Sequence, residues 1–231
     1  RQARADEAEF GSSADDIIRF LGLDAIRDEL ASNLPQGHLR ALGMAIGLVC
    51  AVAHADGGRA TRTAIAGYVE FIRNIPLLLL VYLVFYGVPS IGGFAYDATT
   101  SFIATLGIYA GAQLTEVFRA GLDAVPPGVV DAGRAIGLTP LRNLVHVRLP
   151  TAFRVSLPAL SNAYISLFKD TALGAVIAVP ELTHQAQWIN FNTFRILEIY
   201  ALLTPIYLVT GWIILAGLRL LERRFAVARA A

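Results

Sequence analysis

Long apolar runs, separated by short polar segments, make up most of the chain after residue 40. The longest runs are residues 75–94, 99–114, 155–179 and 200–218. Only the third contains Asp, Glu, Lys or Arg, in the form of Lys169 and Asp170. A helix that crosses a bilayer needs about 20 mostly apolar residues. The pattern therefore predicts membrane-spanning helices at these four positions.

A further apolar run, residues 41–55, is shorter than the others. At about 1.5 Å per residue it covers roughly 22 Å, less than the ~30 Å hydrocarbon core of a bilayer. Either the helix begins earlier, with His38 and Arg40 near the membrane surface, or this span is lost. We expect an all-α integral membrane protein with about five transmembrane helices, the first one shortened, or four if residues 41–55 do not cross.

Arginine is distributed unevenly over the connecting segments. The arginine-rich segments are residues 56–63, 119–154 and 219–231. The alternate loops, residues 88–100 and 180–199, contain only Arg195. Loops on the cytoplasmic side of membrane proteins carry such an excess of basic residues. We therefore expect a multi-pass protein with a cytoplasmic C-terminus, and an external N-terminus if all the runs cross.

Composition supports the membrane class. Hydrophobic residues make up 55% of the chain and charged residues 16%, against about 25% charged residues in ordinary soluble domains. The net charge of +1 gives no field that would attract nucleic acid. A single cysteine, Cys50, excludes an internal disulfide, and the four histidines show no metal-ligand spacing. We expect no bound metal.

Residues 1–36 have a different character, with four arginines and eight carboxylates. Ser13 is placed to cap a helix with an approximate apolar stripe. One interpretation is an interfacial helix lying on membrane lipids, and another is a loosely ordered leader or soluble cap. The segment lacks the basic face that lipid binding prefers, which favours the second. Residues 37–231 are predicted to form the transmembrane domain.

Residues 119–154 form the longest predicted cytoplasmic segment, and its turn residues divide it into two short helices. A first helix is predicted over residues 129–136, after the Pro126-Pro127-Gly128 sequence. Gly137 is placed to end it in a left-handed conformation. Thr139 and Pro140 resemble an N-cap followed by proline at the first helical position.

A second helix is predicted from there to about Val147, with Pro150 closing it before the next span. Turn and capping residues placed in this way are typical of a rigid docking element, although an ordinary structured loop also contains them.

Three stretches together resemble one family. Asp131-Ala-Gly-Arg-Ala-Ile-Gly137, followed by Val147-Arg-Leu-Pro150, is similar to the cytoplasmic Glu-Ala-Ala signature of ABC importer permeases. Val69-Glu-Phe-Ile-Arg-Asn-Ile-Pro-Leu-Leu78 resembles the second-span entry of polar amino-acid permeases. Ser166-Leu-Phe-Lys-Asp-Thr-Ala-Leu173, with Val179-Pro-Glu-Leu182, is similar to two further segments of that subfamily. Order and spacing agree over about residues 41–225.

The resemblance implies a type I ABC importer permease fold and a role in ATP-driven import of polar amino acids across the bacterial inner membrane. It implies four kinds of partner: ABC ATPase subunits, a second permease subunit (the same or a homologous chain), a periplasmic or lipid-anchored amino-acid-binding protein, and membrane lipids. ATP would be used by the ATPase, because this chain has no Walker A pattern and no evident catalytic cluster. We predict a non-enzymatic chain with no cofactor of its own and no nucleic-acid partner.

By the same resemblance, the residues that couple the permease to the ATPase are Asp131, Ala132, Gly133, Gly137, Leu149 and Pro150. Small residues allow a helix to seat closely in a groove of a partner. Four positions depart from the family pattern: Asp131 replaces glutamate, Gly133 replaces the second alanine, Val129 stands where the subfamily often has glutamine, and Ala172 replaces the serine after Lys-Asp-Thr. A glycine within a helix costs about 1 kcal/mol relative to alanine, so the departures put the strength of coupling in doubt.

Charged residues inside predicted spans are functional candidates. Lys169, Asp170 and Thr171 are assigned to the translocation pathway or to a permease–permease contact, with snorkelling at the outer interface as the alternative. Gly174 and Pro180 predict a break in the helix just beyond them.

Three charged residues lie at the predicted cytoplasmic ends of other spans. Glu116 and Arg119, one turn apart, are predicted to pair, with gating by Glu116 as the alternative. Arg73 stands at the start of the second span, where it could anchor at headgroups or line the pathway.

Two other functions compete with the importer hypothesis. One is a secondary transporter or channel driven by an ion gradient, although the chain shows no inverted repeat of the kind common in that class. The other is a truncated, non-functional permease, if the first span is lost.

Overall fold

The computed structural model describes residues 36–92 and 96–225, with side chains from residue 42 onward. Apart from Gln36, the predicted polar segment 1–36 lies outside the described residues. Every regular element in the described part of the chain is helical. The chain divides into two compact units, residues 1–115 and 116–231, with the boundary inside one long helix.

In residues 36–92 and 96–115, the described part of the first unit, there are four helices, a π-helical turn and the beginning of α6. Its elements are α2 (Gln36–Asp56), α3 (Arg59–Asn74), α4 (Leu77–Tyr82), the π-turn η3 (Leu83–Gly87), α5 (Val88–Gly92) and α6 (Ala98–Asp123) as far as Thr115. Helix α2 has 21 residues, which corresponds to about 31 Å. The helix is therefore longer than the apolar run that predicted it, and its length does not prevent it from crossing a bilayer.

Glycines bring α2 against α6. A β carbon on Gly47 would lie 2.6 Å from Cβ of Leu114, and one on Gly43 would lie 2.8 Å from Cβ of Ala110. The two backbones therefore approach more closely than larger side chains would allow, as is common between helices in membranes. Tyr68 of α3 joins the contact by donating a hydrogen bond of 2.7 Å from its hydroxyl to the carbonyl of Ile108.

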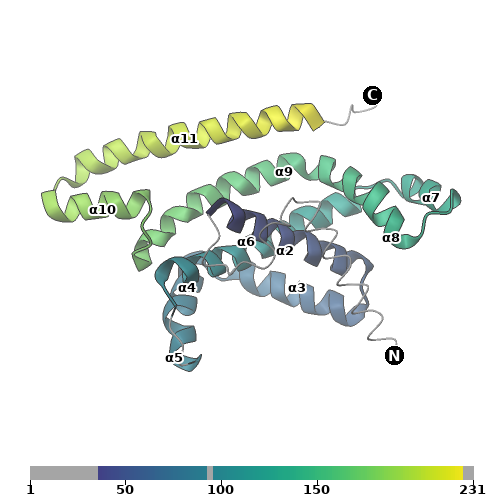
Figure 1. Cartoon of the computed structure of the whole chain (residues 1–231), viewed down its shortest axis with the longest axis horizontal. Helices are drawn as coiled ribbons and strands as arrows, with labels where there is room; N and C mark the ends of the chain where they lie inside the picture. Colours follow the sequence, from purple (N-terminus) through teal and green to yellow (C-terminus); the bar gives the residue numbers. More distant parts are fainter. Residues whose placement is uncertain (1–35, 93–95, 226–231) are drawn as a thin grey trace. The chain divides into compact units, whose positions relative to one another are not determined.

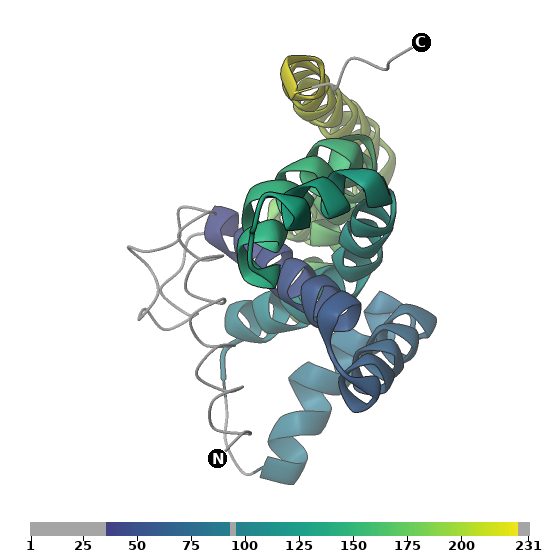
Figure 2. The same cartoon turned by 90° about the vertical axis from the view of Figure 1, so that its right-hand side faces the viewer.

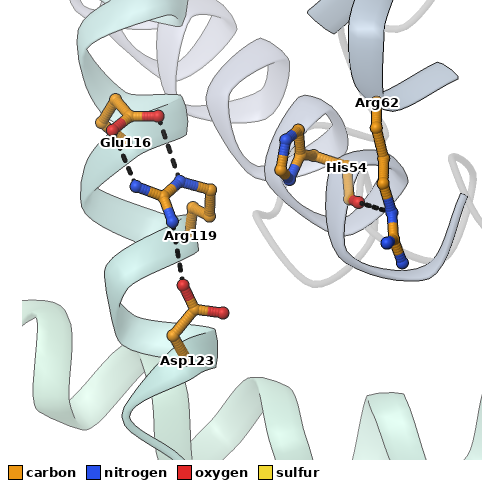
Figure 3. Close-up of polar contacts among 5 residues, drawn as sticks. All are labelled: His54, Arg62, Glu116, Arg119 and Asp123. Carbon is orange, nitrogen blue, oxygen red and sulfur yellow. Dashed lines mark hydrogen bonds and ion pairs between the residues drawn. The ribbon is translucent and has the colours of Figure 1, made fainter. Parts of the chain in front are cut away.

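Arg62 fixes the tight connection between α2 and α3. Its guanidinium donates hydrogen bonds to the carbonyls of His54 (3.0 Å) and Ala55 (2.9 Å) in the last turn of α2 (Figure 3). The last carbonyls of a helix have no partner within the helix. Arg62 therefore acts as a C-cap from outside the helix.

A bend of 103° separates α3 from the helical run 77–92. Ile75 is extended and Pro76 precedes the first helical residue of α4, so the predicted start of the second apolar helix is confirmed. Within the run, the π-turn η3 was not predicted. The N–H of Val88 bonds the carbonyl of Leu83, five residues back, directly before Pro89. A proline ring clashes with the carbonyl four residues back in an α-helix, and the wider turn relieves that clash.

The second unit is built around α9. Its elements after α6 are α7 (Pro127–Ala135), α8 (Pro140–Asn143), the π-turn η4 (Leu144–Arg148), α9 (Leu149–Asp170), the 3₁₀ segment η5 (Thr171–Ile177), α10 (Leu182–Thr193) and α11 (Ile196–Phe225). Helix α11 lies alongside α9 in both views, while α7 and α8 lie at one end of α9 and α10 at the other (Figure 1 and Figure 2).

Among the described residues, α11 alone is long and apolar enough to cross a membrane as a single straight helix. Only 6% of its most apolar stretch is buried, so its side chains are open to lipid or to another chain. Up to three spans result if each of two bent pairs, α3 with 77–92 and 140–177 with α10, is one span. The predicted count of about five therefore stays a prediction.

Candidate functional site

The first candidate site is α7 with its two ends. Pro127 occupies the first turn of the helix, and Gly137 lies just past its end with φ of +84°. The N–H of Gly137 bonds the carbonyl of Arg134 at 2.9 Å, and that of Leu138 bonds the carbonyl of Gly133 at 3.1 Å. This pair of bonds is a Schellman motif, which uses a left-handed glycine to satisfy the last carbonyls of a helix. The predicted helix and its glycine stop are confirmed.

The following helix begins as predicted but does not end as predicted. Oγ1 of Thr139 accepts a hydrogen bond of 3.3 Å from the N–H of Arg142, and Pro140 occupies the first turn. Pro150, however, does not close the helix, and the prediction there is wrong. It lies in the first turn of α9, after the π-turn η4, in which the N–H of Leu149 bonds the carbonyl of Leu144. The wider turn accommodates the proline, as it does before Pro89.

Leu149 and Pro150 therefore belong to one continuous helical run, 140–177, which leads from the turn after α7 into α9. Both side chains are partly buried. The side-chain amide of Asn143, at the end of α8, donates a hydrogen bond of 2.8 Å to the carbonyl of Val130 and so links α7 to this run. The arrangement is a short helix fixed to the end of a long one.

The exposed surface of α7 is apolar along one face. Val129, Ala132 and Ile136 follow one another at helical spacing and are all exposed, with Ile136 79% exposed. Asp131 forms an exposed ion pair of 3.1 Å with Arg134. Val129 and Ile136 are not among the site residues predicted from the sequence, although their helical spacing can be seen there.

Gly133, by contrast, is buried against Asn143. A β carbon on Gly133 would lie 2.8 Å from Nδ2 of Asn143, and this amide donates a hydrogen bond of 2.8 Å to the carbonyl of Val130. Asn143 is only 2% exposed. The contact explains why glycine is suitable where the family pattern has alanine. Sequence reasoning missed Asn143, because nothing in the local pattern indicates this contact.

The second candidate site is the break after α9. Helix α9 ends at Asp170, the chain continues as a 3₁₀ segment from Thr171, and Ala178 adopts a left-handed conformation with φ of 60°. The predicted break is confirmed. Lys169 is exposed, whereas Asp170 and Thr171 are partly buried, and Oγ1 of Thr171 donates a hydrogen bond of 2.6 Å to the carbonyl of Phe168.

Glu181 organises the far side of this break. Its carboxylate accepts hydrogen bonds from the N–H groups of Thr183 (2.8 Å) and His184 (2.6 Å) and so caps α10. It also accepts one of 3.1 Å from the hydroxyl of Tyr207 on α11. The sequence analysis used Glu181 only as part of a family motif, since its partner lies 26 residues away.

A third cluster lies at the end of α6. Arg119 donates two hydrogen bonds to Glu116, of 3.1 and 3.0 Å, and a third of 2.9 Å to Asp123 (Figure 3). The predicted pairing of Glu116 with Arg119 is confirmed, and Asp123 extends it. The hydrogen bonds to Glu116 are the main reason that the pKa of Arg119 lies above its usual value. The cluster joins successive turns of one helix.

Within the second unit, the predicted site residues lie at opposite ends of α9. Helix α7, which carries residues 131–135, lies at one end of α9 (Figure 1), and Lys169 lies in the last turn of α9. Arg73 is exposed in the last turn of α3, in the first unit. The arrangement offers a docking element at one end of α9 and a helix break lined by ionisable residues at the other.

Comparison with known proteins gives a consistent result. Residues 43–227 match the family described as binding-protein-dependent transport system inner membrane component. The chain is 38% identical to the L-cystine transport system permease protein TcyB of Bacillus subtilis, over 79% of this chain and 78% of that protein. It is 34% identical to the glutamine transport system permease protein GlnP of Escherichia coli, over 80% of this chain and 85% of that protein.

A solved structure of an amino acid ABC transporter with histidines superposes with a TM-score of 0.72 at 32% identity, covering 82% of this chain and 90% of that chain. The MetNI methionine ABC transporter, at 19% identity and a TM-score of 0.67, shares the fold over 83% of this chain and 90% of that chain. The chain is therefore a permease that belongs to the family of binding-protein-dependent transport system inner membrane components.

Proposed function

We propose that this chain forms the membrane pathway of an ATP-driven importer for polar amino acids, and that α7 docks on the ATPase. The amino-acid class follows from the names of the relatives, which transport cystine or glutamine. The docking role is carried by one observation: the exposed apolar face made by Val129, Ala132 and Ile136 on a helix that is capped at its C-terminal end.

Two physical arguments support this face as the ATPase contact. An apolar side chain as open as Ile136 gains by burial against a partner, at about 25 cal/mol per Å² of surface removed from water. Ala132 is exposed and has a small side chain, which lets a partner groove approach the backbone of α7. The charged pair Asp131–Arg134 would lie at the polar rim of such an interface.

The same proposal assigns a role to the residues at the base of α7. Leu149 and Pro150 stand at the start of α9, in the continuous helical run that follows the α7 turn. Movement of α7 with the ATPase would be passed along this run to the far end of α9. Lys169, Asp170 and Thr171 lie there, beside the 3₁₀ break, where they would line the pathway or a contact with a second permease subunit.

The remaining assignments concern orientation and partners. The arginine-rich segments support a cytoplasmic position for α7 and the C-terminus, beside the ATPase that would consume ATP. Arg73, at the end of α3, would lie at the same membrane surface, and Glu116 would serve the ion-pair cluster rather than a gate. A second permease chain and an external binding protein complete the proposed assembly.

Retention of the ATPase during purification tests the docking role. The chain is expressed in membranes with the ATPase of an amino-acid importer, extracted in mild detergent and captured by a tag on its own C-terminus. We expect Ile136→Asp to reduce ATPase retention by roughly tenfold or more, because it places a charge in the centre of an apolar contact. Ala124→Asp is the matched control, since Ala124 is exposed just before α7. Equal retention by the two variants would contradict the proposed docking face.

A further inference from the structure

The contact between Gly133 and Asn143 joins α7 to the helix that follows it. Asn143 closes α8, and its backbone N–H bonds the carbonyl of Thr139 at 2.8 Å. Its side chain crosses to α7, where Nδ2 donates to the carbonyl of Val130 at 2.8 Å. One buried amide therefore bridges the two helices behind the exposed apolar face.

Between α7 and α8 there is no room for a side chain at position 133. A β carbon there would lie 2.8 Å from Nδ2, 3.1 Å from Cγ and 3.2 Å from Oδ1 of Asn143. All three atoms of the amide group would be crowded at once. Rotation of the amide could relieve the clash only by giving up the hydrogen bond to Val130. An alanine at 133 would therefore displace either the amide or α7.

The amide is not fully satisfied where it lies. Oδ1 of Asn143 is buried and has no hydrogen-bond partner among the described residues. A buried acceptor left without a partner is unfavourable. The presence of asparagine at this position is therefore poorly explained by stability alone. It is better explained by the directional hydrogen bond that its amide donates to Val130.

We propose that Asn143 is a positioning residue that holds α7 at the angle required for coupling, and that Gly133 is its matched partner. This inference rests on the proposed docking of α7 on the ATPase. By this inference, glycine replaces the family's alanine at position 133 because Asn143 occupies the space of the methyl group. The replacement then does not weaken coupling. The amide touches neither substrate nor ATPase and acts through the orientation of Val129 and Ile136.

The test uses the assembled transporter, containing this chain, the ATPase and the binding protein, in lipid vesicles. The quantity measured is the number of amino-acid molecules imported per ATP hydrolysed, together with ATPase retention in detergent. The variants are Gly133→Ala, Asn143→Ala and the double variant. Gly128→Ala is the matched control, because it lies on the same helix and a β carbon there would meet nothing within 4 Å.

We expect Gly133→Ala and Asn143→Ala each to lower import per ATP by roughly tenfold while the complex still assembles, which is within the usual range of coupling between two sites. The double variant should lose about as much as either single variant, rather than the roughly hundredfold expected if the two losses multiplied, because both changes break the same contact. Gly128→Ala should match the unaltered chain. This non-additivity, in a complex that still assembles, distinguishes positioning from a general loss of folded protein.

Normal import per ATP by both single variants would overturn this inference and leave the docking proposal intact. A double variant whose loss is roughly the product of the two single losses would also overturn it, because the two positions would then act independently. Failure of the unaltered chain to retain any ATPase, in contrast, would overturn the proposed function itself.

Discussion

Ser156 packs directly against Gly121. Its Oγ lies 1.9 Å from the position that a β carbon on Gly121 would occupy, and the carbonyl of Ala152 lies 2.9 Å from it. The same hydroxyl donates a hydrogen bond of 3.3 Å to the carbonyl of Val117. The last turns of α6 and the first turns of α9 therefore meet almost backbone to backbone, at the end of α9 that carries α7.

Replacing Gly121 with alanine should destabilise the protein by about 1–3 kcal/mol, because the added carbon overlaps atoms that include a backbone carbonyl. Thermal unfolding in detergent measures the effect. Gly217→Ala in α11 is the matched control, since a β carbon there meets nothing within 4 Å and alanine is the better helix former. Equal stability of the two variants would show that the close contact between α6 and α9 is absent.

Gly137 provides a second test through its backbone. A β-branched residue in the left-handed conformation costs about 1–3 kcal/mol, so Gly137→Val should distort the stop of α7. We expect ATP hydrolysis to continue while import falls, with membrane insertion unchanged. Gly137→Asn should be much milder, because asparagine tolerates this conformation. Normal import by the valine variant would contradict the role given to the turn.

The Arg119 cluster should contribute stability rather than gating. Its side chain is about one-third exposed, and exposed ion pairs are worth only about 0.2–1 kcal/mol each. Arg119→Gln should therefore lower the melting temperature slightly at low salt and by less at high salt, with import unchanged. Lost import at normal stability would instead assign a gate to Glu116 and Arg119.

Asp97, just before α6, should make stability depend on pH. Its carboxylate accepts hydrogen bonds from the hydroxyl (2.5 Å) and the N–H (3.0 Å) of Thr100, which lower its pKa. A lowered folded-state pKa means that the stabilisation is present above the unfolded pKa and is lost as pH falls through the folded one. The difference in melting temperature between the unaltered chain and Asp97→Ala should thus shrink as pH falls below about 4. A difference that does not vary with pH would contradict this.

Local signals in the sequence predicted the parts of the site that depend on local geometry. Gly137, Thr139 and Pro140 predicted the two caps of the α7–α8 turn, because capping depends on residues within a few positions of each other. Gly174 and Pro180 likewise predicted the break after α9.

Contacts between helices are harder to predict from the sequence. Nothing near Asn143 in sequence indicates that it reaches Val130, 13 residues away. The sequence predicts a helix end at Pro150, because a π-turn before a proline is rarer than a stop. A π-turn stands before both Pro89 and Pro150, at the same offset from the proline. The two prolines are therefore accommodated in the same way.

Uptake by reconstituted vesicles tests the central claim most directly. The chain, an amino-acid importer ATPase and its binding protein are placed in vesicles, and uptake of labelled glutamine is followed with ionophores present to remove ion gradients. We predict uptake that requires ATP, survives the ionophores and is lost in Ile136→Asp. Uptake that needs no ATP and disappears with the ion gradient would contradict the account and favour an ion-driven carrier.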